Sequence, residues 1–240
     1  MKAVVLVGGF GTRLRPLTFS LPKPLLPVGD QPLLKLLLEQ LCNSGLRDVV
    51  LATGYHAELI HAFCGDGSRF GLRVRYVHED EPLGTAGPIS LVRPLLDGDD
   101  FLLINGDILT RFDFRTIGEF RREHEYDLVV AYRRHVYESP YGVLSLEGAD
   151  VTAIVEKPRL EQTISAGIYA GTPRVADLVP ANTFFTMPQL IEVLLQAGKR
   201  VGGLEIEDLW QGLETIVHFE DAVRQVAELD PQPRDQPERR

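Results

Sequence analysis

The chain has 240 residues, of which 44% are hydrophobic and 25% are charged, and its formal net charge is −9. This is enough apolar material for one large domain or two small ones, and the acidic balance argues against a nucleic-acid groove, which usually has a basic surface. The apolar run after Met1-Lys2 is too short for a signal peptide, and no run approaches the roughly 20 residues of a membrane span. The two cysteines, Cys42 and Cys64, lack metal-ligand spacing. We therefore expect a cytoplasmic protein with reduced thiols and no membrane or nucleic-acid partner.

In chain order, apolar runs rich in β-branched residues alternate with segments of helical periodicity. The apolar runs predict buried strands at 3–7, 49–53, 74–77, 101–104 and 128–131. The segments between them predict helices at 31–44, 57–64, 86–96 and 113–124. This alternation indicates βαβ units, and hence an α/β fold of three layers around a mostly parallel sheet.

After about residue 135 the pattern changes. Short extended pieces stand among turns at 142–145, 151–155 and 166–170, and a helix is predicted at 188–196. We interpret residues 1–228 as a single domain, in which a second half, 136–228, completes the first half, 1–135. Residues 229–240 carry prolines among charges and are predicted to be disordered.

A glycine cluster follows the first predicted strand directly and comprises Gly8, Gly9 and Gly11. Such a cluster exposes backbone N–H groups at the carboxyl end of a strand, where ligands of α/β sheets bind. It matches neither G-x-G-x-x-G nor G-x-x-x-x-G-K-[ST]. Residues 1–30 contain four basic side chains and one acidic one, a local patch that suits a small polyanion. A tight turn in a solvated loop is the alternative interpretation at this point.

The longer run around this cluster is more specific. GGFGTRLRPLT at 8–18, followed by PKPLLPV at 22–28, closely resembles the signature of the sugar-1-phosphate nucleotidylyltransferases. The resemblance extends more thinly from residue 1 to about 210, and it implies a Rossmann-like nucleotidyltransferase fold with a mixed sheet. In that family the loop wraps the triphosphate, which implies nucleotide contacts from Gly8, Gly9, Gly11 and Thr12. Arg13 would hold phosphate oxygens, and Lys23, fixed between two prolines, would neutralise charge as phosphorus is attacked.

A second segment concerns the base. EDEPLGTAGP at 79–88, together with LVGG at 6–9, is most similar to the mannose-1-phosphate guanylyltransferases. The family places this segment beside the base, which implies contacts from Glu79, Gly84 and Thr85. A carboxylate at Glu79 could accept from both N1–H and the 2-amino group of guanine, whereas thymine and uracil offer one donor beside two carbonyls. The alternative is an ordinary solvated acidic turn.

The apolar run at 102–104 ends in Asn105-Gly106-Asp107. The superfamily carries its magnesium-binding aspartate at the end of this strand, so the resemblance implies a Mg²⁺ cofactor held by Asp107, with Gly106 beside the nucleotide. A single protein carboxylate is compatible with Mg²⁺, which keeps several waters and phosphate oxygens as ligands. A cap before Thr110 is the alternative role.

Two later motifs resemble those that bind the acceptor, PYGV at 140–143 and VEKP at 155–158. By this resemblance, Gly142 lets the sugar lie against backbone, Glu156 accepts from sugar hydroxyls and Lys157 pairs with the sugar phosphate. SAGIY at 165–169 is similar to the family's Asn-Ala-Gly-[IMV]-Tyr, which adds Ser165 and Gly167, with serine in place of the asparagine. Residues 1–135 are therefore the predicted nucleotide-binding half and residues 136–228 the acceptor-binding half.

One motif departs from the family pattern. The family usually has an aromatic residue, a variable residue and then Asp-Ile-Gly, whose aspartate is a second metal ligand. This chain reads WQGLET at 210–215, so Gly212 stands at the aspartate position. Asp208 or Glu214 could substitute, but neither has the right offset. We therefore expect weak metal binding in the absence of nucleotide.

The resemblance implies attack by a sugar 1-phosphate oxygen on the α-phosphorus of a nucleoside triphosphate, with GTP favoured, to give a nucleotide-sugar and pyrophosphate. The nucleophile is already an anion, so no general base is required. Two alternatives stay open: thymidylyl, cytidylyl or uridylyl transfer to another sugar phosphate, and a non-catalytic nucleotide-sugar-binding subunit that regulates a transferase. Longer relatives append a β-helix, which we do not expect here. The sequence leaves the oligomeric state open, a homo-oligomer included.

Overall fold

The computed structural model describes residues 1–229, so the predicted disordered segment lies, apart from Leu229, outside the described residues. Its centre is a seven-stranded sheet in the order β12-β8-β11-β6-β1-β4-β5. These strands are β1 (Lys2–Leu6), β4 (Asp48–Thr53), β5 (Arg73–His78), β6 (Phe101–Asn105), β8 (Leu128–Glu138), β11 (Arg159–Gly171) and β12 (Val201–Glu205). In this sheet β11 is antiparallel to both neighbours, and the other adjacent pairs are parallel. The predicted α/β fold with a mostly parallel mixed sheet is confirmed.

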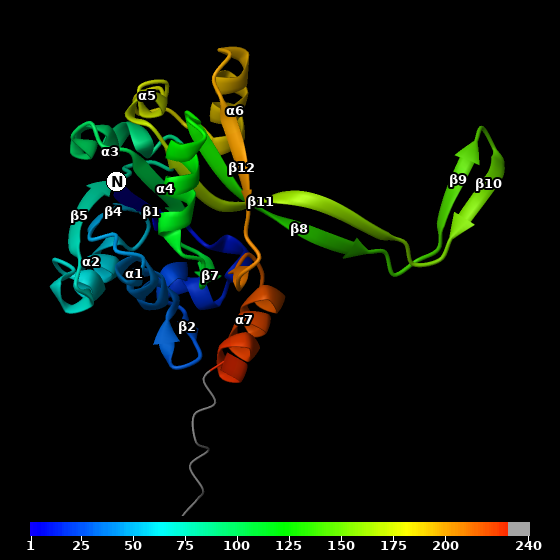
Figure 1. Cartoon of the computed structure of the whole chain (residues 1–240). Coiled ribbons are helices and arrows are strands. Elements are labelled where there is room, and N and C mark those ends of the chain that lie inside the picture. The colour runs from blue at the N-terminus through cyan, green and yellow to red at the C-terminus, as the bar shows by residue number, and fades with distance from the viewer. Residues whose placement is uncertain (230–240) are drawn as a thin grey trace, which may run out of the picture.

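Helices cover both faces of the sheet, which gives three layers (Figure 1). One face packs against α1 (Leu33–Asn43), α2 (Ala57–Cys64) and α4 (Phe114–Glu123), and the other against α3 (Ile89–Leu96), α5 (Pro173–Ala176) and α6 (Met187–Gln196). In β1, Ala3 and Val5 belong to the first of these cores and Val4 to the second. A strand buried on both faces is apolar throughout, which is why this segment shows no alternation in the sequence. Within residues 1–229, no helix has the length and apolar character needed to cross a bilayer.

Shorter elements beside the sheet were not predicted from the sequence. β2 (Pro27–Val28) pairs with β3 (Gln31–Pro32), and β7 (Ile108–Thr110) pairs antiparallel with β13 (Trp210–Gly212). The final helix, α7 (Ile216–Leu229), packs through Ala222 in a third apolar cluster with Val28 and Leu213. The backbone N–H of Leu213 donates to the carbonyl oxygen of Asp107 at 2.9 Å. These contacts bring the segment around Gly212 beside the end of β6.

β8 and β11 continue beyond the body of the protein as a two-stranded ladder. Residues 134–163, which we call the arm, pair from Arg134 with Thr163 outward to Glu138 with Arg159. β9 (Val143–Glu147) and β10 (Asp150–Val155) form a hairpin at its tip, and every residue of that hairpin is exposed. Figure 1 shows this hairpin projecting far from the sheet. The second half of the chain thus contributes both to the body and to a separate extension.

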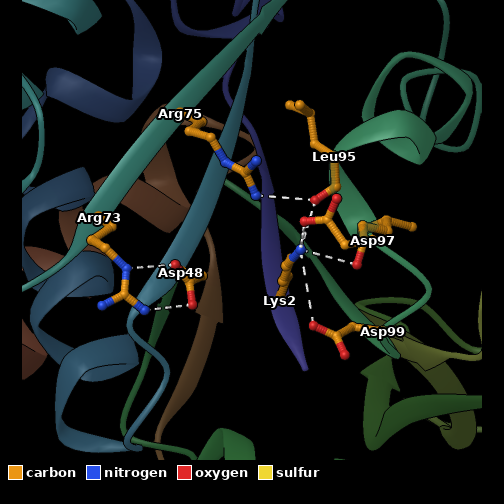
Figure 2. A network of polar contacts seen from close by, with 8 residues as sticks. Lys2, Asp48, Arg73, Arg75, Leu95, Asp97 and Asp99 are labelled. Atoms are coloured by element: carbon orange, nitrogen blue, oxygen red, sulfur yellow. Dashed lines mark hydrogen bonds and ion pairs between the residues drawn. The ribbon is translucent and has the colours of Figure 1, made fainter.

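The opposite, amino-terminal edge of the parallel strands has its own polar network. Lys2 starts β1, and its ammonium donates to the carbonyl oxygens of Leu95 at 2.9 Å and Leu96 at 3.0 Å (Figure 2). It also pairs with Asp97, and this hydrogen bond holds the pKa of Asp97 below its ordinary value. Lys2 is 10% exposed in its side chain. It therefore serves the structure of this edge and does not belong to the basic patch around Arg13 and Lys23.

Candidate active site

A cavity lies where β1 and β6 end. The two strands are parallel neighbours, so the residues that follow them reach the same edge of the sheet. This cavity, which we call the Gly8 cavity, has a volume of about 320 Å³. Nine of the predicted site residues line it: Gly8, Gly9, Gly11, Lys23, Glu79, Gly84, Thr85, Gly106 and Asp107. Phe184, which the sequence did not single out, adds an aromatic side chain.

A second cavity of about 260 Å³ adjoins the first and is lined by Gly11, Thr12, Arg13, Leu14, Lys23, Asp107 and Glu214. We call it the Arg13 cavity. It shares Gly11, Lys23 and Asp107 with the Gly8 cavity, so the two form one continuous depression. The glycine cluster, both predicted phosphate-binding cations and the predicted metal ligand are therefore brought together.

The cations of this depression are paired with carboxylates. The ammonium of Lys23 contacts the carboxylate of Asp107, and the two side chains are 14% and 31% exposed. Pro22 and Pro24 flank Lys23, which begins a short 3-10 helix. The guanidinium of Arg13 lies 3.1 Å from the carboxylate of Glu214, in a more exposed pair. Two positive and two negative side chains thus neutralise one another around the Arg13 cavity.

Glu79 is set apart from the acidic residues that follow it. Glu79 is half-buried beside the glycine cluster, whereas Asp80 and Glu81 are exposed. One carboxylate oxygen accepts from the backbone N–H of Leu83 at 3.0 Å, and a side chain at Gly8 would come within 2.8 Å of the other oxygen. Burial raises the pKa of the Glu79 carboxyl, and the hydrogen bond from Leu83 opposes this shift. An ordinary solvated turn would not show this burial.

Three other predicted nucleotide contacts have structural roles of their own. Gly84 has a φ of +79°, and a Cβ there would lie 2.7 Å from the carbonyl oxygen of Phe185. A Cβ at Gly106 would lie 2.5 Å from the carbonyl oxygen of Leu6. The hydroxyl of Thr85 accepts from the backbone N–H of Met187 at 2.8 Å, at the start of α6. The packing of the chain itself therefore requires glycine at positions 84 and 106, and the predicted nucleotide contacts of these residues stay predictions.

The oxygen ligands of the Arg13 cavity suit a hard divalent cation. Asp107 and Glu214 both line it, and magnesium is typically held by one or two carboxylates together with substrate phosphates. Among the side chains of residues 1–226, which the structure describes, there is no group of three or more His, Cys, Asp or Glu placed to hold a metal ion. The residues present therefore fit an ion shared with a phosphorylated ligand better than a site built by protein alone. Glu214 comes from the segment between β13 and α7, which the sequence did not place.

The predicted acceptor motifs are not brought to these cavities. Gly142, Glu156 and Lys157 lie in the exposed arm, and none of them lines the Gly8 or Arg13 cavity. They are neighbours of one another, since a Cβ at Gly142 would lie 3.0 Å from a carboxylate oxygen of Glu156. Lys157 has a φ of +45°, at the turn between β10 and β11. Their predicted role in acceptor binding stays a prediction.

Ser165 and Gly167 occupy a different position, where β11 passes from the arm into the sheet. The strand register shifts between Ser165 and Tyr169, and the hydroxyls of these two residues are 2.8 Å apart. Gly167 has a φ of +70°, and a Cβ there would lie 2.6 Å from the amide nitrogen of Asn105. Asn105 lines the Gly8 cavity, so Gly167 packs against a residue of the cavity wall.

A third cavity of about 410 Å³ lies at the base of the arm. We call it the Arg133 cavity. Its lining comes mainly from β8, β13 and α7, with Ile164 from β11, and includes Arg133, Arg134, His135, Trp210, Gly212, His218 and Gln225. Glu214 lines both this cavity and the Arg13 cavity. Gly212 lines the Arg133 cavity, so a residue at this position faces a different space from Asp107.

The match to known families agrees with this geometry. The family model described as Nucleotidyl transferase matches residues 2–228, and the chain belongs to that family. Among solved structures, a protein described as a glucose-1-phosphate thymidylyltransferase from Bacillus anthracis, in complex with a sucrose, superposes with a TM-score of 0.79, 25% identity and 96% coverage of both chains. HddC from Yersinia pseudotuberculosis has the same fold, with a TM-score of 0.73 at 24% identity over 94% of this chain and 99% of that one.

The similar curated proteins carry a narrower name. Mannose-1-phosphate guanylyltransferase catalytic subunit beta of Xenopus tropicalis is 33% identical over 220 residues, which cover 89% of this chain and 61% of that protein. The subunit of the same name from Dictyostelium discoideum is 35% identical over 217 residues, which cover 88% and 60%. Mannose-1-phosphate guanyltransferase of Saccharomyces cerevisiae is 33% identical over 218 residues, with 88% and 60% covered. The chain spans about three fifths of the length of these relatives.

Proposed function

We propose that this chain transfers a nucleoside monophosphate from a nucleoside triphosphate to a sugar 1-phosphate and releases pyrophosphate. The observation that carries this proposal is the convergence of Arg13, Lys23 and Asp107 on one depression beside a glycine cluster. Membership of the nucleotidyl transferase family and the names of the similar proteins support the same reaction class.

Lys23 and Arg13 bind the triphosphate in this proposal, because both line the Arg13 cavity and both are cations. Each must leave its carboxylate partner for a phosphate oxygen, and Asp107 and Glu214 then become free to hold Mg²⁺. When bound, this ion would neutralise phosphate oxygens as charge develops on the leaving pyrophosphate. The attacking oxygen of a sugar phosphate is already anionic, so the side chains position and neutralise, and none has to remove a proton.

The nucleoside lies in the Gly8 cavity, with its base beside Glu79. The half-buried carboxylate of Glu79 favours guanine, because guanine presents two adjacent N–H donors where uracil and thymine present one donor between carbonyl oxygens. One oxygen of Glu79 already accepts from the Leu83 backbone, and a carboxylate oxygen has two lone pairs, so it can accept a second bond. GTP is therefore the proposed donor. Residues 1–135 supply most of the nucleotide contacts and residues 136–228 the acceptor contacts.

The test is pyrophosphate release over a grid of GTP, UTP, dTTP and CTP against mannose 1-phosphate and glucose 1-phosphate, with Mg²⁺ present. We expect release with GTP to exceed that with the other nucleotides. A better rate with UTP or dTTP would remove the guanylyl assignment and leave the reaction class. No release with any pair, together with measurable binding of a nucleotide-sugar, would instead indicate a regulatory subunit without activity.

A further inference from the structure

The hairpin at the tip of the arm has one strongly apolar face. Leu144 pairs with Ile154 and Leu146 pairs with Val151, and a register shift between Val151 and Ala153 brings both pairs to the same side of the hairpin. All four of these side chains are more than half exposed, from 51% at Leu144 to 66% at Ile154. A contiguous exposed apolar patch commonly marks a protein interaction site, and a two-stranded hairpin gains little stability by itself. This face is therefore a candidate docking surface.

The arm also holds the predicted acceptor residues away from the cavities of their own chain. β11 pairs with β8 residue by residue from Arg159 to Ser165. At about 3.3 Å per residue, this ladder places Lys157 roughly 25 Å from the point where β11 enters the sheet, and Figure 1 shows the arm projecting away from the body. A continuous ladder cannot fold back without losing backbone hydrogen bonds. In this geometry Glu156 and Lys157 do not reach the Arg13 cavity of the same chain.

A second exposed apolar surface lies in the loop after the glycine cluster, residues 10–21. Its large exposed apolar side chains are Phe10, Leu17, Phe19 and Leu21. Arg13 belongs to this loop and lines the Arg13 cavity, so the loop borders the predicted triphosphate site. A segment that docks on this loop would therefore lie beside that site.

The two surfaces have opposite charge. Residues 138–156 contain four acidic side chains and no Lys or Arg, whereas residues 10–29 contain three basic side chains and no Asp or Glu. Among the basic side chains, Arg15 is exposed, and its guanidinium lies over the ring of Phe19 at 5.1 Å. Complementary charge brings two surfaces together and selects against wrong partners. The loop therefore matches the hairpin both in apolar character and in charge.

We propose that the apolar face of the hairpin docks on residues 10–21 of a second copy of this chain. Because each chain carries both surfaces, the exchange is reciprocal and closes a symmetric dimer. In this dimer the arm of one copy extends to the depression around Arg13 of the other copy, and Glu156 and Lys157 complete the active site of that other copy. The completion of the site rests on the proposed function, whereas the docking of the hairpin does not.

The first test is sedimentation velocity of the full chain over a wide range of concentrations, which should show a dimer. Leu146→Lys should raise the dimer Kd about 100-fold, because it places a charge in an apolar contact and against a basic loop. Ser145→Lys is the matched control, since Ser145 pairs with Ala153 on the other face of the hairpin and is also exposed. A chain that stays monomeric at every concentration, or equal losses in the two variants, would overturn the proposal.

The second test concerns the loop. Arg15→Gln should raise the dimer Kd about 3–10-fold and make the dimer less sensitive to salt, because it removes a charge that attracts the acidic hairpin. Arg174→Gln removes the same charge from an exposed residue of α5 and is the control. A dimer that Leu146→Lys breaks and Arg15→Gln leaves unchanged would mean that two hairpins pair with each other, and would overturn the assignment to residues 10–21.

The third test asks whether two chains share one active site. Lys23→Ala and Lys157→Ala should each be nearly inactive alone. When the two variants are co-expressed, pyrophosphate release should recover to about one quarter of the unmodified activity, since about half of the dimers are mixed and each of these has one intact site. Activity no higher than that of the separate variants would overturn the shared site. If the unmodified chain releases no pyrophosphate, the proposed function fails, and sedimentation still decides whether the hairpin docks.

Discussion

The Gly8 cavity and the arm both carry motifs that resemble one family, but the fold holds them in different ways. The cavity residues follow β1 and β6, and the backbone N–H of Gly106 donates to the carbonyl oxygen of Leu6 at 2.9 Å, so one sheet edge fixes them. Glu156 and Lys157 lie instead in an exposed turn of the arm, between β10 and β11, whose pairs nearest this turn are with other strands of the arm. The sheet therefore positions a motif only where the strands that precede it end at the same edge. Elsewhere, residues that match the family motifs can lie outside the cavities that the other motifs line.

Among the predicted site residues that the sheet edge positions, Lys23→Ala should have the largest effect on turnover. Lys23 is the least exposed cation of the depression, and it is held between two prolines. Loss of a preorganised charge contact in such a site typically costs about 10²–10³ in turnover, and we expect a fall in kcat of that order at saturating substrates. Lys35→Ala is the control, because Lys35 pairs with Glu39 on α1 and lines neither cavity. A Lys23 variant with the kcat of the control would remove the phosphate-binding role.

The second largest effect is expected for the preference between nucleotide bases. GTP should be preferred to UTP and dTTP by about 10–100-fold in kcat/KM, as for other single buried polar pairings, and Glu79→Gln should narrow this ratio. The preference also depends on pH, because only the ionised carboxylate accepts two N–H groups. Since burial raises the pKa of Glu79, the preference is complete above that pKa. As pH falls it should be lost at a higher pH than an ordinary glutamate would give, which rate profiles with GTP and UTP would measure.

The same contrast explains how far the sequence could predict this protein. Strand and helix periodicity predicted β1, β4, β5 and β6, and the order of parallel strands brings Gly8, Asp107 and Glu79 to one edge. The position of Glu214 depends on the pairing of β13 with β7, two strands of three residues each, too short for a periodic signal. The arm was unpredictable for another reason. The sequence of 142–155 indicates strands, but nothing in it says whether they fold back over the sheet.

The variant Gly212→Asp tests whether the position at which this chain departs from the family pattern is close enough to the proposed Mg²⁺ site to bind the ion. Gly212 has ordinary backbone geometry, and a Cβ there would make normal contacts with Trp210, so the variant should fold. Gly212 lines the Arg133 cavity together with Glu214, which also lines the Arg13 cavity, so a carboxylate at this position adds negative charge beside the proposed triphosphate site, and we expect the KM for GTP to rise about 10-fold. Gly212→Ala, which adds volume without charge, is the control. A lower Mg²⁺ requirement with an unchanged KM for GTP would instead mean that the new carboxylate reaches the ion.

The smallest expected effect concerns the carboxylate that joins the cavities. In the free chain Glu214 pairs with Arg13 at 3.1 Å, so it competes with phosphate for the guanidinium. Both side chains are mostly exposed, and exposed pairs of this kind are typically worth less than about 1 kcal/mol, so Glu214→Gln should strengthen metal-free GTP binding by only about 2–5-fold. The same change removes an oxygen ligand, so Mg²⁺ should strengthen GTP binding less in the variant than in the unmodified chain.

Glu220→Gln makes the same charge change on α7 at an exposed residue and controls for long-range electrostatics. Titrations of GTP with and without Mg²⁺ then measure the coupling directly, because a carboxylate that both blocks Arg13 and binds the ion makes metal and nucleotide binding depend on each other. Identical titrations for the two variants would show that Glu214 contributes charge alone.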